Sequence, residues 1–200
     1  MPSLLALSRL IDAINQKTGL FTCWLILLCT LISAGNALMR YGLNYSSNAY
    51  LEIQWYLFSA VFLLASAWTL QQGAHVRIDL LAGKLPVRVQ AYIDIFGSLF
   101  MLIPVSLIIV YYGWTAFTTS WGAQTQWLLG FIPWPVQPEY SSDAGGLVRW
   151  PVKLLVPIAF AMLIAQGLSE IIKRIAFLKG LVEWHPGGHN TNAPASAGGQ

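Results

Sequence analysis

The chain has 200 residues, of which 56% are hydrophobic and 10% are charged. Because soluble proteins carry about a quarter charged residues, this composition excludes an ordinary soluble domain and indicates an integral membrane protein. The formal net charge of +3 could suit nucleic acid or a membrane surface, and the positions of the basic residues decide against nucleic acid.

The first eighteen residues form a candidate amino-terminal segment, 1–18, with a helical period. Its apolar residues recur at helical spacing: Leu4, Leu7, Ile11 and Ile14. Polar residues occupy the other side: Ser8, Arg9, Asp12, Asn15 and Gln16. This pattern predicts a short amphipathic helix in the membrane interface, with a frayed cytoplasmic arm as the open alternative.

Four runs with almost no charge follow, and a helix needs about 20 apolar residues to cross the bilayer. We predict spans at about 19–39, 53–74, 93–118 and 154–172, within a membrane domain that covers residues 19–179. The predicted fold class is therefore all-α, with four transmembrane helices and short interfacial segments. The first run is longer than the core of a signal peptide, so we expect it to be retained.

The basic residues are distributed unevenly between the two sides of the predicted membrane domain. Eight lie in the amino-terminal segment, the loop after span two and the carboxy-terminal tail: Arg9, Lys17, Arg77, Lys84, Arg88, Lys173, Arg174 and Lys179. Three lie in the other two loops: Arg40, Arg149 and Lys153. By the positive-inside rule, this predicts a multi-pass protein with both termini in the cytoplasm.

Span two carries small residues at a seven-residue interval, which returns to nearly the same helix face. The repeat contains Ser59, Ser66 and Gly73, and each has an alanine after it: Ala60, Ala67 and Ala74. Small residues permit close helix approach in membranes, so this strip is a predicted packing surface. Glu52 continues the strip, and we expect Arg40 to lie near it at the outer surface.

The predicted outer loop, 119–150, is rich in tryptophan and proline. Trp121, Trp127 and Trp134 indicate either an aromatic belt on the outer membrane face or a docking surface for a periplasmic partner. The tail, 180–200, is rich in Gly, Ala, Asn and Pro and is predicted to be disordered. His185 and His189 in it are expected to be solvated rather than bound to metal.

The predicted spans lack the residues that intramembrane chemistry requires. They contain no histidine for a haem, and the acids Glu52, Asp94 and Glu170 all lie at predicted span ends. No phosphate-binding glycine loop and no nucleophile arrangement is present. The sequence therefore predicts a chain that is not an enzyme, holds no cofactor or metal, has no buried charge and does not transport by itself.

Several short motifs occur in a fixed order along the chain. They are Glu52-Ile-Gln-Trp55 at the head of span two, His75-Val-Arg77-Ile-Asp79 after that span, and Leu85-Pro86 before span three. Together with the four-span topology, they resemble the small permease subunit of the tripartite ATP-independent periplasmic transporters, the DctQ-like family. The resemblance covers about Lys17 to Ile175, and the long outer loop resembles the longer forms of that family.

The resemblance implies a bacterial inner-membrane machine in three parts. A periplasmic substrate-binding protein delivers an organic acid, a large multi-span permease subunit transports it by sodium-coupled symport, and the small subunit is a scaffold. His75 and Asp79 are expected to pair with each other or bind phospholipid headgroups, with a gating role as the alternative. Other classes are a stand-alone four-helix exporter, which needs a central acid, and an accessory subunit of a respiratory complex, which the missing haem ligands disfavour.

Overall fold

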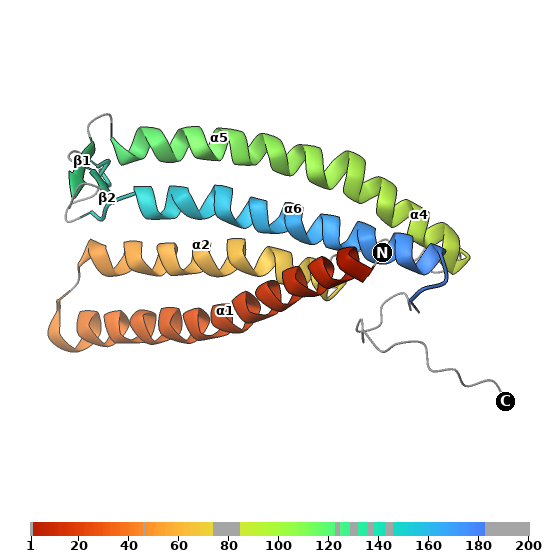
Figure 1. The fold of residues 1–200 in the computed structure, drawn as a ribbon. Coiled ribbons are helices and arrows are strands. Elements are labelled where there is room, and N and C mark those ends of the chain that lie inside the picture. The colour runs from red at the N-terminus through yellow and green to blue at the C-terminus, as the bar shows by residue number, and fades with distance from the viewer. Residues whose placement is uncertain are drawn as a thin grey trace. The chain divides into compact units, whose positions relative to one another are not determined.

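The computed structural model describes residues 2–45, 47–73, 85–122, 125–128, 132–135, 138–142 and 146–182. Its helical elements in chain order are α1 (Pro2–Leu43), α2 (Asn48–Gln71), α4 (Val87–Gly97), the π-helical turn η1 (Ser98–Leu102), α5 (Ile103–Trp121) and α6 (Trp150–Leu178). Two short strands, β1 (Thr125–Leu128) and β2 (Ile132–Pro135), lie between α5 and α6 (Figure 1). The motif His75, Arg77 and Asp79 and the tail from residue 183 lie outside the described residues.

Four helical stretches are long and apolar enough to cross a membrane: Ser3–Leu43, Asn48–Gln71, Val87–Trp121 and Trp150–Leu178. The third joins α4, η1 and α5. The predicted all-α class with four candidate spans is therefore confirmed. Each helix is longer than its predicted span, although α2 ends at Gln71, three residues before the predicted end of span two.

The chain divides into two compact units. The terminal unit comprises Met1–Thr18, Ser66–Leu107 and Ala161–Gln200, and the loop unit comprises Gly19–Ala65 and Ile108–Phe160. Each unit contains part of every candidate span. Neither unit could therefore be recognised as a continuous piece of sequence.

In the described residues, large apolar side chains are exposed and polar side chains are buried, the reverse of the pattern in a soluble protein. All the buried hydrophobic residues are alanines: Ala60, Ala67, Ala91, Ala159 and Ala176. Large apolar side chains are exposed along every candidate span, among them Trp24, Phe62, Tyr111 and Ile158. Helices in lipid gain nothing by burying leucine, whereas small residues allow close approach and polar groups need partners inside. The burial pattern thus supports a lipid-exposed surface.

The first eighteen residues continue into the first span, since α1 is one helix of 42 residues. Within the terminal unit, the polar residues Ser8, Asp12 and Asn15 are buried, whereas Leu7 and Ile14 are exposed. The predicted amphipathic segment is thus helical and is part of α1. Its polar side does not face water, however, because that side packs against polar residues of α6.

A glycine of α6 lies against the π-helical turn in the terminal unit. A Cβ added to Gly167 would lie 2.8 Å from the Leu102 Cδ2 atom, closer than real Cβ contacts. A π-turn carries one extra residue in the helical ladder, and such turns interrupt an otherwise regular helix. Gly167 therefore allows α6 to pack closely against the Leu102 side chain of this turn.

In the loop unit, α5 and α6 approach each other closely at Gly113. A Cβ on this residue would lie 3.3 Å from both the Pro157 Cδ and Val156 Cγ1 atoms. Pro157 lies inside α6. A proline ring cannot move aside as a flexible side chain can, so the absence of a side chain at Gly113 permits this contact.

The predicted outer loop contains regular structure that the sequence analysis did not anticipate. Strands β1 and β2 pair in antiparallel register, with Thr125 opposite Pro135 and Leu128 opposite Ile132. A separate antiparallel bridge joins Tyr140 to Val148. The part of the loop that the structure describes is thus partly held by backbone hydrogen bonds.

Candidate functional site

In the terminal unit, the polar side of α1 meets a polar stripe on α6. The Ser8 and Ser169 hydroxyl oxygens lie 2.7 Å apart, and Asn15 Nδ2 donates to Gln166 Oε1 at 2.6 Å. A serine or amide inside a membrane helix is stable when a partner across the interface satisfies it. These contacts align the first four turns of α1 with the last turns of α6.

A buried lysine joins the two helices by ion pairs. Lys173 Nζ lies 2.7 Å from Asp12 Oδ2 and 2.9 Å from Glu170 Oε1. The Gln166 side-chain nitrogen donates to Asp12 Oδ1 at 3.1 Å and to Glu170 Oε1 at 3.2 Å. All three charged residues are over 90% buried. Each carboxylate thus receives both a cation and a neutral donor, as buried charges require.

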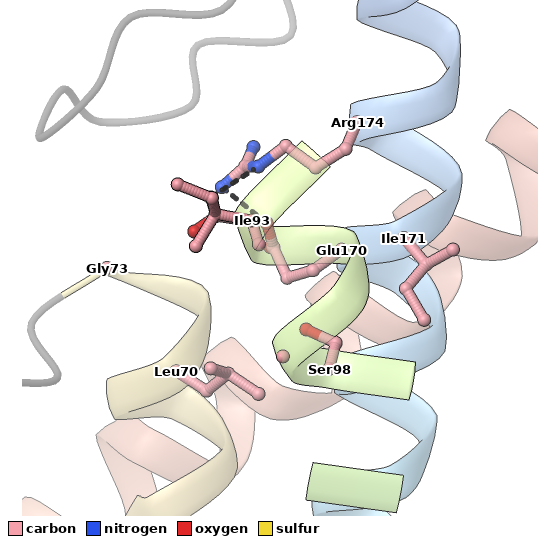
Figure 2. Close-up of a pocket in the computed structure, with 9 residues that line it drawn as sticks. Leu70, Gly73, Ile93, Ser98, Glu170, Ile171 and Arg174 are labelled. Carbon is pink, nitrogen blue, oxygen red and sulfur yellow. Dashed lines mark hydrogen bonds and ion pairs between the residues drawn. The ribbon is translucent and has the colours of Figure 1, made fainter. Parts of the chain in front are cut away.

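A second cation extends this set to α4. Arg174 Nη2 lies 3.2 Å from Glu170 Oε2, and Arg174 Nε lies 3.0 Å from Asp94 Oδ2. Figure 2 shows Arg174 and Glu170 reaching from α6 to one side of a cavity of about 280 Å³, with Leu70 of α2 and Gly73, just after α2, on the other side. We call Asp12, Asp94, Glu170, Lys173 and Arg174 the charged cluster.

The charged cluster corrects the prediction that the chain has no buried charge. The sequence analysis placed Asp12 on the polar side of an interfacial helix and counted Lys173 and Arg174 among the cytoplasmic charges after span four. A signal was present in the sequence: Ser8, Asp12 and Asn15 on one helix, and a matching polar stripe on another, namely Gln166, Ser169, Glu170 and Lys173. Both sets recur at intervals of three and four residues, which place them on one face.

At the other end of α2, in the loop unit, Glu52 binds the described part of the outer loop. Its Oε2 atom accepts the Leu147 backbone N–H at 2.5 Å, and the Tyr56 hydroxyl donates to the Val148 carbonyl at 3.2 Å. Glu52 is 5% exposed. Arg40 is exposed and has no ion pair among the described residues of this unit, so the expected Arg40–Glu52 pair is not formed.

An ion pair also holds the loop to α6 in the same unit. Glu139 accepts a hydrogen bond from Lys153 and lies 3.7 Å from Arg149 Nη1. The Lys153 ammonium group lowers the pKa of the Glu139 carboxyl below its ordinary value, so the carboxylate stays ionised at neutral pH. Glu52, Trp55 and Ser59 help to line an adjacent cavity of about 290 Å³.

Aromatic rings pack beside this loop. The Trp121 and Trp150 ring centroids are 4.6 Å apart at 76°, and Phe117 lies 5.5 Å from Trp121. Edge-to-face contacts of this kind are favourable beyond the area they bury. Trp121 therefore joins the end of α5 to the start of α6. The side chains of Trp127 and Trp134 lie outside the described part, and their docking role stays a prediction.

The small-residue strip of α2 lies partly inside the protein. In the loop unit Ala60 is buried and Ser59 is half-buried; in the terminal unit Ala67 is buried, and Ser66 and Gly73 are half-buried. Trp55 lies beside the strip and is 66% exposed. The buried alanines place neighbouring helices directly against the α2 backbone.

Replacing Glu52 with glutamine should loosen the outer loop. The neutral amide oxygen is a weaker acceptor for the Leu147 N–H than a carboxylate, so we expect faster proteolytic cleavage between residues 138 and 149. Arg40→Gln is the matched control, and we expect no change in its cleavage rate. Equal loosening by both substitutions would instead indicate that Arg40 and Glu52 act as a pair.

The described ranges bring no group of three or more His, Cys, Asp or Glu side chains together to hold a metal ion. The charged cluster contains three acids, but two basic side chains occupy their oxygens. Its acidic and basic side chains neutralise one another between helices and thereby stabilise the helix arrangement.

Comparison with known protein families found a match over most of the chain. The family model for the tripartite ATP-independent periplasmic transporters, DctQ component, matches residues 29–177, about three quarters of the chain. No curated protein matches the chain. The matched range takes in the second and third candidate spans whole and most of the fourth. The chain is therefore a member of the DctQ family, a component of a transporter rather than a member of an enzyme family.

Proposed function

We propose that this chain is a non-catalytic small permease subunit that scaffolds the large transporting subunit. The observation that carries this proposal is the pairing of the charged cluster. Asp12, Glu170 and Lys173 bind one another, and Arg174 binds Glu170 and Asp94. A proton or ion path needs ionisable groups that exchange partners with water, whereas these groups hold three helices together.

The family supports the rest of the assembly. Its members work with a large permease subunit and a periplasmic substrate-binding protein, and our proposal places this chain in the bacterial inner membrane with both termini cytoplasmic. The binding protein would select an organic acid, and the large subunit would couple its uptake to sodium. The outward apolar side chains of the candidate spans provide surface for lipid and for the large subunit.

A stand-alone exporter is the competing function. Such a protein needs an acid within its spans that alternates between a proton and its cargo. Glu170 is a buried acid of α6, but it accepts from Gln166 and pairs with Lys173 and Arg174. No observation in the described residues favours the exporter.

Reconstitution into vesicles tests the proposal. With an inward sodium gradient, the chain together with the large subunit and the binding protein should take up substrate, and the chain alone should take up none. Omitting this chain should lower uptake, because the large subunit would lose its scaffold. Uptake by the chain alone above that of empty vesicles would refute the scaffold function. Collapsing the sodium gradient in the full assembly is the control for coupling.

A further inference from the structure

Among the described residues of the terminal unit, acidic and basic side chains differ in exposure. Its described acids are buried or half-buried, and each is paired within the charged cluster. Every described charged side chain that is exposed in this unit is basic: Arg9, Lys17, Arg88 and Lys179. Among the described residues of this unit, the acids are therefore covered and the exposed charges are positive.

On α1 this positive charge is combined with exposed apolar side chains. Leu10, Ile14 and Lys17 follow one another at i, i+4 and i+7, which places them along one stripe of the helix. Leu10 is 59% exposed and Ile14 is 51% exposed. Their stripe lies opposite the side that carries Asp12 and Asn15, so the cluster and the stripe use different faces of the same turns.

We propose that this stripe, with Leu7 at one edge and Arg9 between the stripe and the side that carries Asp12, binds anionic phospholipid. The leucine and isoleucine side chains would contact acyl chains, and the two cations would bind headgroup phosphates. The proposal is independent of the scaffold function, because it concerns the lipid around the chain and not the transport step.

Two observations favour lipid over an acidic protein surface. First, the residues of this stripe continue without a break into the apolar part of α1, a helix long and apolar enough to cross a membrane, so their exposed apolar side chains lie within reach of a bilayer. Second, Lys17 lies within that apolar stripe, and a lysine there can bury its methylene chain against acyl chains while its ammonium group reaches the phosphates. A basic residue near an anionic membrane surface favours binding by roughly fivefold.

The test measures which lipids the full-length chain retains. The chain is reconstituted in an equal mixture of phosphatidylglycerol and phosphatidylcholine, extracted in mild detergent, and its bound lipids are quantified by mass spectrometry. Wild type should be enriched in phosphatidylglycerol over the bulk mixture. Arg9→Gln with Lys17→Gln should lower that enrichment severalfold. Arg40→Gln, which removes another exposed arginine of α1, is the matched control and should leave it unchanged.

Two further measurements keep the proposal open to refutation if the double variant folds poorly. The swap of Arg9→Lys with Lys17→Arg should keep the enrichment, and raised salt should weaken it in the wild type, because charge attraction is screened. A wild-type ratio equal to the bulk mixture would overturn the proposal. The proposal would also be overturned if Arg9→Gln with Lys17→Gln reduced co-purification with the large subunit but left the bound lipids unchanged.

Discussion

Lys173→Gln should lower the free energy of unfolding by about 3 to 5 kcal/mol, the range found when one partner of a buried ion pair is removed. Lys173 Nζ is within 2.9 Å of both Asp12 and Glu170, so its loss leaves Asp12 buried without a cation. Glu170 would keep Arg174 as a partner. The apparent melting temperature of the chain in mild detergent measures the effect.

Lys179→Gln is the matched control for this prediction. Lys179 lies six positions further along the chain and is exposed, so its substitution should change stability by less than about 0.5 kcal/mol. Adding Asp12→Asn to Lys173→Gln should recover part of the loss, because it removes the carboxylate that lost its cation. If Lys173→Gln and Lys179→Gln were equally mild, the charged cluster would have no stabilising role.

Ala67→Leu should destabilise the terminal unit by about 1 to 3 kcal/mol or more, as overpacking of a close-packed interior does. Ala67 is 1% exposed, so the added carbon atoms have no space without separating helices. The measurement is again the melting temperature in detergent, together with the yield of the complex with the large subunit.

Two substitutions separate packing from hydrophobicity. Leu64→Ile conserves volume at a half-buried position of α2, and Phe62→Leu changes a side chain that is 71% exposed. Both should be tolerated. Destabilisation by Phe62→Leu as large as that of Ala67→Leu would show that the α2 surface toward lipid, rather than its small-residue strip, controls stability.

The four spans were predictable because crossing hydrocarbon imposes a length and an absence of charge that a single sequence displays. The sequence did not show which side of α1 faces the protein interior. An amphipathic pattern gives the polar and apolar sides of a helix, but the surroundings decide which one is buried. In water Leu7 and Ile14 would be covered; next to lipid, Asp12 and Asn15 are covered instead.

The groups that the candidate residues contact also could not be predicted from the sequence alone. Proximity in topology suggested that Arg40 would pair with Glu52, whereas the structure gives Glu52 a backbone N–H from a loop 95 residues away. The strands β1 and β2 have no alternating pattern long enough to predict them, since each has four residues. Local composition therefore gave the helices, and contacts distant in sequence determined the site.

The charged cluster joins residues separated by 161 positions in the chain, from the beginning of α1 to the end of α6. At synthesis rates of roughly 5 to 20 residues per second, Asp12 leaves the ribosome about 10 to 30 seconds before its lysine partner exists. During that interval the Asp12 carboxylate has no lysine partner and must remain hydrated. The first helix therefore cannot reach its final position until the last one is made, and a chain truncated before Lys173 would expose an unpaired acid that quality-control proteases could detect.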